Sequence, residues 1–305
     1  MHEYIGCVDL NLDYYEGSDA YTDGIVEDQI LEIVKNVPKE DYHCVIEERA
    51  DWSILYHLSE IRENIVNWID FEGSESVLEI GSGCGAITGI LAQKCHDVTC
   101  IDLSHKRSLI NAYRNKEKEN IEILVGNFEK IYDKLEKKYD VITLIGVFEY
   151  AQCYIAAERP FHEFLNMIKS LLKEDGKLII AIENQFGLKY WAGCQEDHIR
   201  EVFSGLEGYR NTNRVRTFSR TKLEQILGET GFARTQFFYP YPDYKFPTVI
   251  YSDDYLPSAG ALNNNMRNMD GDRMHLFDES MVYDGLIDSN MFPFFSNSFL
   301  VIAER

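Results

Sequence analysis

The sequence has few of the features that would place it outside the ordinary globular proteins. Its seven cysteines are odd in number and include no C-x-x-C pair, which argues against a disulfide framework and a zinc ribbon. Its longest apolar runs, such as residues 178–182, are strand-length and far below the ~20 residues of a membrane span. The first residues show no basic segment followed by an apolar one, so no secretory signal is predicted. We therefore expect a soluble, cytoplasmic protein with reduced thiols.

Positive charge is scarce in the sequence. Lys and Arg number 30 against 51 Asp and Glu, which gives a formal net charge of −21. Such a charge repels polyanions, so nucleic acid would need a local basic patch. Arg210, Arg214, Arg216 and Arg220 suit such a patch, or equally a phosphate or carboxylate on a smaller ligand. We expect no nucleic-acid partner, and the sequence does not encode the oligomeric state.

From Val77 onward, strand-length apolar runs alternate with stretches of helical periodicity. That alternation is typical of a parallel sheet covered on both faces, so the sequence predicts an α/β, doubly wound, mostly parallel fold. The expected strands cover residues 76–80, 97–102, 121–125, 140–146, 177–183, 234–241 and 298–304. The expected helices cover residues 86–94, 105–118, 128–137, 161–173 and 219–232.

The chain divides into an extension and a core. Residues 1–53 are predicted to form an N-terminal extension or lid, with a helix starting at Asp23. The core is expected over residues 54–305, opening with a helix over about 54–69. Two segments interrupt its alternation of strands and helices and are predicted to be insertions that cap a substrate. These insertions cover residues 185–217 and 242–297.

The strongest local signal is a glycine-rich turn between a buried strand and a helix. Gly81, Gly83 and Gly85 alternate there, and a Cβ at any of them is expected to collide with a bound ligand. Asp102 follows at the end of the next strand, where a carboxylate accepts hydrogen bonds from both hydroxyls of a ribose. The pattern predicts a nucleoside-containing cofactor.

Two classes of nucleoside cofactor fit this turn. The glycines and Ala86 satisfy the relaxed fingerprint of nicotinamide-dependent oxidoreductases. Glu79 weighs against them, because a carboxylate there favours an amine-bearing ligand over a pyrophosphate. Gly85 is expected to leave room for a bulkier group, and Asn127 followed by Phe128 suits the edge and face of an adenine.

With these features the sequence resembles the class I S-adenosylmethionine-dependent methyltransferases. The resemblance covers residues 77–184 well and extends over most of the chain from Tyr56 onward. It implies S-adenosylmethionine as cofactor and a seven-stranded Rossmann-like sheet of order 3-2-1-4-5-7-6 with an antiparallel last strand. The motifs are Val77-Leu78-Glu79-Ile80-Gly81-Ser82-Gly83-Cys84-Gly85, Asp102, Gly126-Asn127-Phe128-Glu129, Tyr139-Asp140-Val141-Ile142 and Leu171-Leu172-Lys173-Glu174-Asp175-Gly176-Lys177-Leu178.

The resemblance also implies which residues hold the cofactor. Glu79 and the glycine backbone would hold the methionine moiety, Asp102 the ribose and Asn127 the adenine, although the family commonly has Asp at this last position. Arg62 is a candidate for the cofactor carboxylate, but an ion pair with a glutamate of its own helix is the favoured alternative. The expected cofactor-binding residues are Tyr56, Arg62, Glu79, Gly81, Gly83, Gly85, Asp102, Leu103, Asn127, Phe128 and Gly146.

A base for an oxygen acceptor should follow the fourth or fifth strand, because open α/β sheets bind ligands at the carboxyl ends of their strands. His198 is the first candidate, since an imidazole beside a carboxylate is expected to titrate near neutral pH. Asp197 and Glu183 complete the predicted catalytic group. We predict no metal site, because ligands adjacent in sequence rarely converge on one ion.

The acceptor is the least specified part of the prediction. The aromatic residues of the two insertions fit a cap that stacks on sugar rings, or equally an ordinary satellite core. Residues 239–257 give a weaker resemblance to methyltransferases of bacterial cell-surface glycan assembly. We therefore expect methyl transfer to an oxygen or nitrogen of a small molecule or sugar. A nicotinamide-dependent oxidoreductase and a non-catalytic binding module are the alternatives.

Overall fold

The computed structural model describes residues 1–19, 24–265 and 273–305. The chain divides into two compact units. Unit 1 comprises residues 1–144 and 167–177, and unit 2 comprises residues 145–166 and 178–305. The expected helix start at Asp23 lies outside the described residues. Within the described ranges, every helix falls short of the length and apolar character that a bilayer span requires.

Unit 1 contains a six-stranded sheet of order β1-β2-β5-β4-β3-β6. All neighbours in it are parallel except the β1 and β2 hairpin, and β2 pairs in parallel with β5. Its strands are β1 (His2–Ile5), β2 (Val8–Asn11), β3 (Ser76–Ile80), β4 (Asp97–Asp102), β5 (Ile121–Val125) and β6 (Tyr139–Ile145). Its helices are α1 (Ile25–Asn36), α2 (Tyr42–Arg49), α3 (Trp52–Leu58), α4 (Asn64–Asn67), α5 (Thr88–Lys94), α6 (His105–Arg114) and α7 (Phe128–Ile131), with short 3-10 helices η1 (Lys39–Asp41), η2 (Glu60–Glu63) and η3 (Tyr132–Lys134).

Unit 2 contains four strands in the order β7-β10-β8-β9, and the C-terminal strand β10 is antiparallel to β8. Helix α9 (Pro160–Leu171) begins in unit 2 and ends in unit 1. Strand β7 (Leu172–Glu183) begins in unit 1 and ends in unit 2. The other strands are β8 (Arg234–Tyr241), β9 (Val249–Ser252) and β10 (Ser298–Glu304). The helices are the 3-10 helix η4 (Phe148–Tyr150) with α8 (Ala151–Tyr154), α10 (Leu188–Trp191), α11 (Arg220–Glu229), α12 (Glu279–Asp288) and α13 (Phe292–Phe295).

The α/β fold with a mostly parallel sheet and an antiparallel last strand is confirmed. Unit 1 reproduces the 3-2-1-4 part of the expected strand order as β5-β4-β3-β6, and unit 2 reproduces the 5-7-6 part as β7-β10-β8. The expected count of seven strands was too low for the described residues. The N-terminal hairpin adds β1 and β2, and the insertion after residue 241 adds β9.

The helix expected over residues 54–69 is broken into three short pieces. Ser59 has an extended backbone at the end of α3, and its hydroxyl accepts a hydrogen bond from the Ile61 N–H to cap the next turn. Similarly, the helix expected over 128–137 ends as α7 at Ile131 and continues only as a 3-10 turn. At Ser59, local capping outweighs the helical periodicity that supported the prediction.

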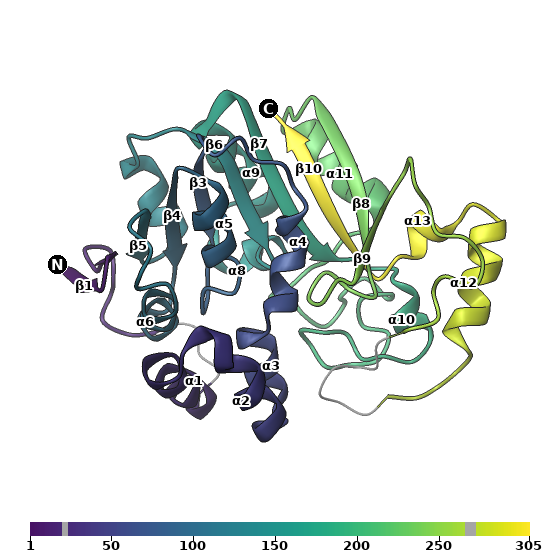
Figure 1. The fold of residues 1–305 in the computed structure, drawn as a ribbon. Coiled ribbons are helices and arrows are strands. Elements are labelled where there is room, and N and C mark those ends of the chain that lie inside the picture. Colours follow the sequence, from purple (N-terminus) through teal and green to yellow (C-terminus); the bar gives the residue numbers. More distant parts are fainter. Residues whose placement is uncertain (20–23, 266–272) are drawn as a thin grey trace. The chain divides into compact units, whose positions relative to one another are not determined.

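The N-terminal extension is part of unit 1. Helices α1, α2 and α3 share a hydrophobic core with Cys84 of the glycine turn and Ile110 of α6. Asp19 accepts hydrogen bonds from the His105 and Lys106 N–H groups, so it caps α6. Figure 1 shows α1, α2 and α3 gathered beside α6. The extension therefore supports the turn and the helix that follows β4.

The insertion aromatics mostly form a satellite core in unit 2. The rings of Tyr239, Tyr251 and Tyr283 each lie within 6.0 Å of the Phe292 ring, and all four residues are buried. Tyr255, Trp191 and Phe294 are exceptions, with exposed fractions of 75%, 44% and 44%. The satellite-core alternative thus accounts for most of these residues.

Candidate active site

The glycine turn of unit 1 follows β3 and precedes α5. Gly81, Gly83 and Gly85 all have positive φ, at 72°, 52° and 74°, a region that disfavours other residues. The Gly81 N–H donates to the Ile101 carbonyl at 2.7 Å, and the Gly83 N–H donates to the Asp102 carboxylate at 2.7 Å. The turn is therefore fixed to the carboxyl end of β4.

The glycines of the turn have different surroundings. A Cβ at Gly83 would have no atom of the described residues within 4 Å, so open space lies beside it. A Cβ at Gly85 would lie 2.3 Å from Oδ1 of Asn111 in α6. The expectation that Gly85 leaves room for a ligand was wrong, because Asn111 fills that space. The open backbone at Gly83 fits the close approach of a nucleoside cofactor.

Asp102 ends β4 and holds the turn through one of its carboxylate oxygens. One oxygen accepts from Gly83, and the other accepts from the Ser104 N–H at 2.9 Å. Burial raises the pKa of the Asp102 carboxyl, while the nearby Arg107 charge acts against the rise. Leu103, the other residue expected here, is half-buried. A carboxylate with further lone pairs beside Gly83 has the chemistry that ribose hydroxyls require.

Glu79 is 4% exposed and points into unit 1. One of its oxygens accepts a hydrogen bond from the Thr88 hydroxyl at 2.6 Å, and the same oxygen lies 3.5 Å from the Cys100 sulfur. The Thr88 hydroxyl in turn accepts from the Asn111 amide at 3.0 Å. Burial raises the pKa of Glu79 to about 7. The described contacts of Glu79 thus join β3, α5 and α6 behind the turn.

Arg62 lies in η2 and is 5% exposed. Its guanidinium lies 3.9 Å from the centre of the Tyr56 ring, and one amino group donates weakly to the Tyr56 carbonyl at 3.5 Å. The expected ion pair with a glutamate of its own helix is absent from the described residues, because Glu63 pairs with Lys39 at 3.0 Å. The Arg62 Nε is buried without a hydrogen-bond partner there. Two predicted residues, Tyr56 and Arg62, are therefore in contact.

Asn127 and Phe128 begin α7 after β5. The Asn127 side-chain oxygen accepts from the Glu129 N–H at 3.0 Å and so caps this helix. Phe128 is 6% exposed, and its ring lies 6.0 Å from that of Tyr132. Both residues thus have a local structural role beside the one predicted for them.

The predicted catalytic residues lie in unit 2. Glu183 ends β7, and Asp197 and His198 follow in the insertion. Glu149, a further carboxylate that is not in the predicted catalytic group, lies in η4. The His198 Nε2 lies 3.3 Å from a Glu183 oxygen and 4.0 Å from a Glu149 oxygen, and its Nδ1 lies 2.8 Å from the Tyr150 hydroxyl. Glu149 and Glu183 are fully buried. The structure therefore brings together three acid and base groups from separate segments.

Two lysines and two aspartates surround this group. The Lys245 ammonium donates to Glu183, and the Lys189 ammonium lies 2.7 Å from Asp197 and 2.8 Å from Asp243. Although burial acts against it, these ammonium groups lower the pKa of Asp197 to about 2. Lys189, Lys245 and Asp243 were missed from the sequence, because the four-residue helix α10 that carries Lys189 and the irregular segment of the other two are too short to show periodicity.

The ionisation of His198 differs from expectation. Burial acts against its charged form, but the Glu183 carboxylate raises the pKa of His198 to about 10. Burial and the Glu183 charge also raise the pKa of Glu149 to about 8. The imidazole was expected to titrate near neutral pH, and that was wrong because the buried Glu183 carboxylate lies 3.3 Å from its Nε2 and stabilises the charged ring.

Gly146, one of the expected cofactor-binding residues, is the second residue of unit 2 and has a positive φ of 70°. Its N–H donates to the Ala181 carbonyl at 2.9 Å. A Cβ there would lie 2.7 Å from the Tyr244 hydroxyl, which itself lies 3.3 Å from Glu183. Within unit 2, Gly146 thus makes room for a tyrosine of the buried charged group.

The arginines between residues 210 and 220 do not act as one open patch. Arg220 forms a two-point ion pair with Asp253, at 2.9 and 2.8 Å. The Arg216 guanidinium lies 6.0 Å from the Tyr209 ring centre. One of the four arginine charges is therefore paired with a carboxylate, which weakens the case for phosphate binding.

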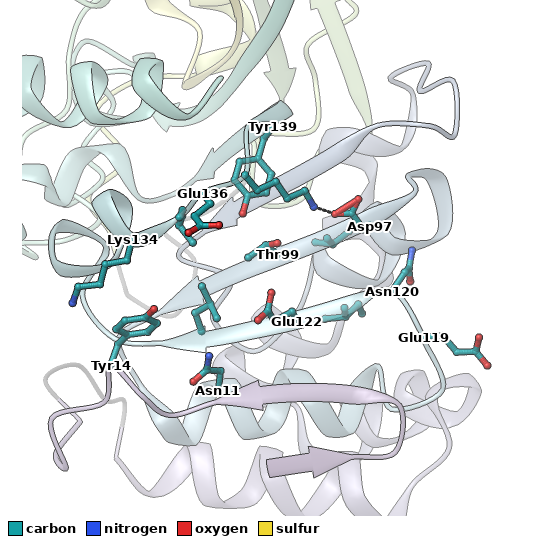
Figure 2. Close-up of a pocket in the computed structure, with 15 residues that line it drawn as sticks. Asn11, Tyr14, Asp97, Thr99, Glu119, Asn120, Glu122, Lys134, Glu136 and Tyr139 are labelled. Atoms are coloured by element: carbon teal, nitrogen blue, oxygen red, sulfur yellow. Dashed lines mark hydrogen bonds and ion pairs between the residues drawn. The ribbon is translucent and has the colours of Figure 1, made fainter. Parts of the chain in front are cut away.

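A separate pocket of about 470 Å³ lies on a sheet face of unit 1 (Figure 2). Thr99, Glu122 and Asn11 lie along its strands, and Tyr14 and Lys134 lie at one end. Burial raises the pKa of Glu122. None of the predicted cofactor-binding residues lines this pocket.

Comparison with known proteins gives a family match over more than half of the chain. Residues 54–236 match the family described as "Methyltransferase domain". The ribosomal RNA small subunit methyltransferase A of Borreliella afzelii is 33% identical over 98 residues, 32% of this chain and 35% of that protein. The tRNA1(Val) (adenine(37)-N6)-methyltransferase of Trichodesmium erythraeum is 28% identical over 82 residues, 25% of this chain and 34% of that protein. The chain thus spans about a third of the length of these curated relatives.

Among solved structures, a SAM-dependent methyltransferase from Archaeoglobus fulgidus is 14% identical, with a TM-score of 0.49 over 87% of this chain and 99% of that one. The phosphoethanolamine N-methyltransferase 1 of Haemonchus contortus, in complex with phosphoethanolamine and S-adenosylhomocysteine, is also 14% identical. Its TM-score is 0.49, over 93% of this chain and 50% of that one.

Proposed function

Because this chain belongs to the class I S-adenosylmethionine-dependent methyltransferases, we propose that it methylates an oxygen or nitrogen of a small-molecule or sugar acceptor. The comparisons do not support a nicotinamide-dependent oxidoreductase, because the family that the chain matches is a methyltransferase family. The observation that carries the proposal is the buried, predominantly acidic group around Glu149, Glu183 and His198. Such a group repels a phosphodiester backbone and attracts hydroxyl or amine donors.

Unit 1 supplies the residues that we propose for the cofactor. The backbone at Gly83 leaves the open space that a nucleoside needs, and Asp102 lies beside it with a carboxylate for ribose. Arg62 carries a buried Nε without a described partner, which suits the carboxylate of the methionine moiety. The bound cofactor supplies the methyl group. The remaining predicted residues, among them Glu79 and Asn127, would position the turn and α7 around it.

Unit 2 supplies the residues that we propose for the acceptor. Glu183 and His198 would orient its nucleophilic atom through hydrogen bonds, and Asp197 would fix Lys189 and Lys245 beside them. Methyl transfer from a sulfonium is an in-line displacement, so alignment and exclusion of water contribute most of the rate. The near-complete burial of this group meets the second requirement.

The cofactor part is tested by calorimetry with S-adenosylhomocysteine. We expect binding to the wild-type chain and a loss of at least about tenfold in affinity, 1.4 kcal/mol, for Asp102→Asn. Asp97→Asn is the matched control, because Asp97 starts the same strand and pairs with the surface residue Lys137. Absence of binding to the wild type, or equal affinity in both variants, would contradict the assignment.

The acceptor part is tested with S-adenosylmethionine labelled in its methyl group. The chain is incubated with cell extract that has been divided into RNA and small-molecule fractions, and label in each product is counted. We expect label in small hydroxyl or amine products. Label confined to the RNA fraction would instead favour an activity like that of the ribosomal RNA relatives, and would overturn the proposed acceptor class.

A further inference from the structure

Glu149, Glu183 and His198 present their donor atoms to one point in unit 2. One carboxylate oxygen of each glutamate and one imidazole nitrogen all lie within 4.8 Å of one another. The measured separations from His198 Nε2 are 3.3 Å to Glu183 and 4.0 Å to Glu149. Two ligands bonded at ~2.1 Å to one ion lie about 3 to 4 Å apart, depending on the angle at the ion. The spacing therefore fits a single metal ion.

The Glu149 carboxylate provides an independent indication of a ligand. Both of its oxygens are buried without a hydrogen-bond partner in the described residues, and its side chain is 1% exposed. A buried acid left in this way costs about 1–3 kcal/mol unless something binds it. His198 is its nearest described cation, at 4.0 Å. A bound cation would satisfy Glu149 and Glu183 together.

The surrounding contacts orient the donors as in metal sites. The Tyr150 hydroxyl holds His198 Nδ1 at 2.8 Å, which leaves Nε2 facing the two carboxylates. The Lys245 ammonium occupies one oxygen of Glu183 and leaves the other toward His198. Hydrogen bonds of this kind fix the ring and the carboxylate of metal ligands.

The charge of the buried group also favours a cation. The group contains five carboxylates but the ammonium groups of only two lysines, Lys189 and Lys245. When all five carboxylates are ionised, an excess of two negative charges remains beside a protonated imidazole, and a divalent cation that replaces this proton reduces it to one. The proton on His198 and a metal ion compete for the same negative field. The carboxylates belong to Glu149, Glu183, Glu196, Asp197 and Asp243.

We propose that Glu149, Glu183 and His198 bind one divalent transition-metal ion. Two carboxylate oxygens and one imidazole nitrogen suit Mn²⁺ and Zn²⁺. Three protein ligands leave coordination positions open, where an acceptor hydroxyl could be polarised. The inference rests on the geometry of unit 2 and stands whether or not the proposed methyl acceptor is correct.

The test is a titration of the full-length, metal-stripped chain with MnCl₂. The electron paramagnetic resonance signal of free Mn²⁺ measures how much of the metal remains unbound. We expect one Mn²⁺ bound per chain, displaced by ZnCl₂. Glu149→Gln is nearly isosteric and removes a charged ligand, and His198→Ala removes the nitrogen, so each should weaken binding at least tenfold. The matched control is Glu224→Gln, which alters an exposed acid of α11 and should bind as the wild type does.

Several outcomes would overturn the metal site. These are no Mn²⁺ binding by the wild type, unchanged binding in a correctly folded Glu149→Gln variant, or an equal loss in Glu224→Gln. Thermal unfolding checks the folding of each variant, and a wild-type midpoint that MnCl₂ raises would support binding to the folded state. Calorimetry with S-adenosylhomocysteine on the same samples keeps the two proposals apart. Cofactor binding without Mn²⁺ binding defeats only the metal site, and the reverse defeats only the cofactor assignment.

Discussion

Replacing Glu79 by Gln should change how the stability of the protein depends on pH. Burial raises the pKa of this carboxyl from its ordinary 4.5 to about 7, and the neighbouring Thr88, Cys100, Asp102 and Arg114 modify that rise. The folded state therefore prefers protonated Glu79. Its contribution to stability is complete below pH 4.5 and is lost as the pH rises to 7. At 1.36 kcal/mol per pH unit, the loss is about 3 kcal/mol.

Gln keeps a side-chain oxygen that accepts the hydrogen bond from the Thr88 hydroxyl, and it carries no charge. Glu79→Gln should therefore not lose stability as the pH rises. Urea denaturation at pH 5 and pH 8 measures the free energy of unfolding of both proteins. The variant should gain about 2 to 3 kcal/mol relative to the wild type between those two pH values. The control Glu75→Gln alters a half-buried acid just before β3 whose contacts do not include Thr88. An equal difference at both pH values would show that Glu79 is charged in the folded protein.

Three further predictions concern unit 1. Glu27→Ala removes the buried partner of Arg107, 2.6 Å away, and should cost about 3–5 kcal/mol in urea denaturation, whereas a loss under 1 kcal/mol would argue against a structural role for this pair. Asp19→Asn weakens the cap of α6 and should cost about 1 kcal/mol in the same assay, with no change expected if the extension is detached in solution. Gly85→Ala should destabilise the fold by more than 2 kcal/mol through a steric clash. Gly83→Ala should cost about 1–2 kcal/mol of backbone strain, and its main effect should be weaker S-adenosylhomocysteine binding in calorimetry. Equal effects of the two substitutions on stability would contradict their different surroundings.

Strand positions were predictable because buried parallel strands are short, apolar and bounded by turns. The ranges 76–80, 97–102 and 121–125 agree with the structure to the residue. Helix ends were less predictable, because they depend on side chains that compete with the helix for backbone groups. Ser59 is such a residue, and its hydroxyl begins a new turn where the periodicity continues. The N-terminal strands escaped notice because an edge hairpin of four-residue strands is too short to show a pattern.

The candidate site also contains a part that was predictable from the sequence and a part that was not. The glycine turn and Asp102 could be found because their spacing is local in sequence. The group around His198 could be found only in part, because its members come from η4, β7 and two irregular segments that the sequence does not align. Glu149 shows the difficulty most clearly. Its importance comes from having two buried oxygens without described partners, and no pattern of neighbouring residues indicates that.

The two glycines of the turn show why a motif alone does not identify a ligand contact. Gly83 and Gly85 have similar backbone conformations and lie two residues apart, yet one adjoins open space and the other adjoins Asn111. A glycine is required at Gly85 for packing against α6, so its presence would persist in a protein that had lost the cofactor. Only Gly83, held by Asp102, combines an unfilled space with a carboxylate beside it. The cofactor assignment therefore depends on Gly83 and Asp102 and not on the number of glycines.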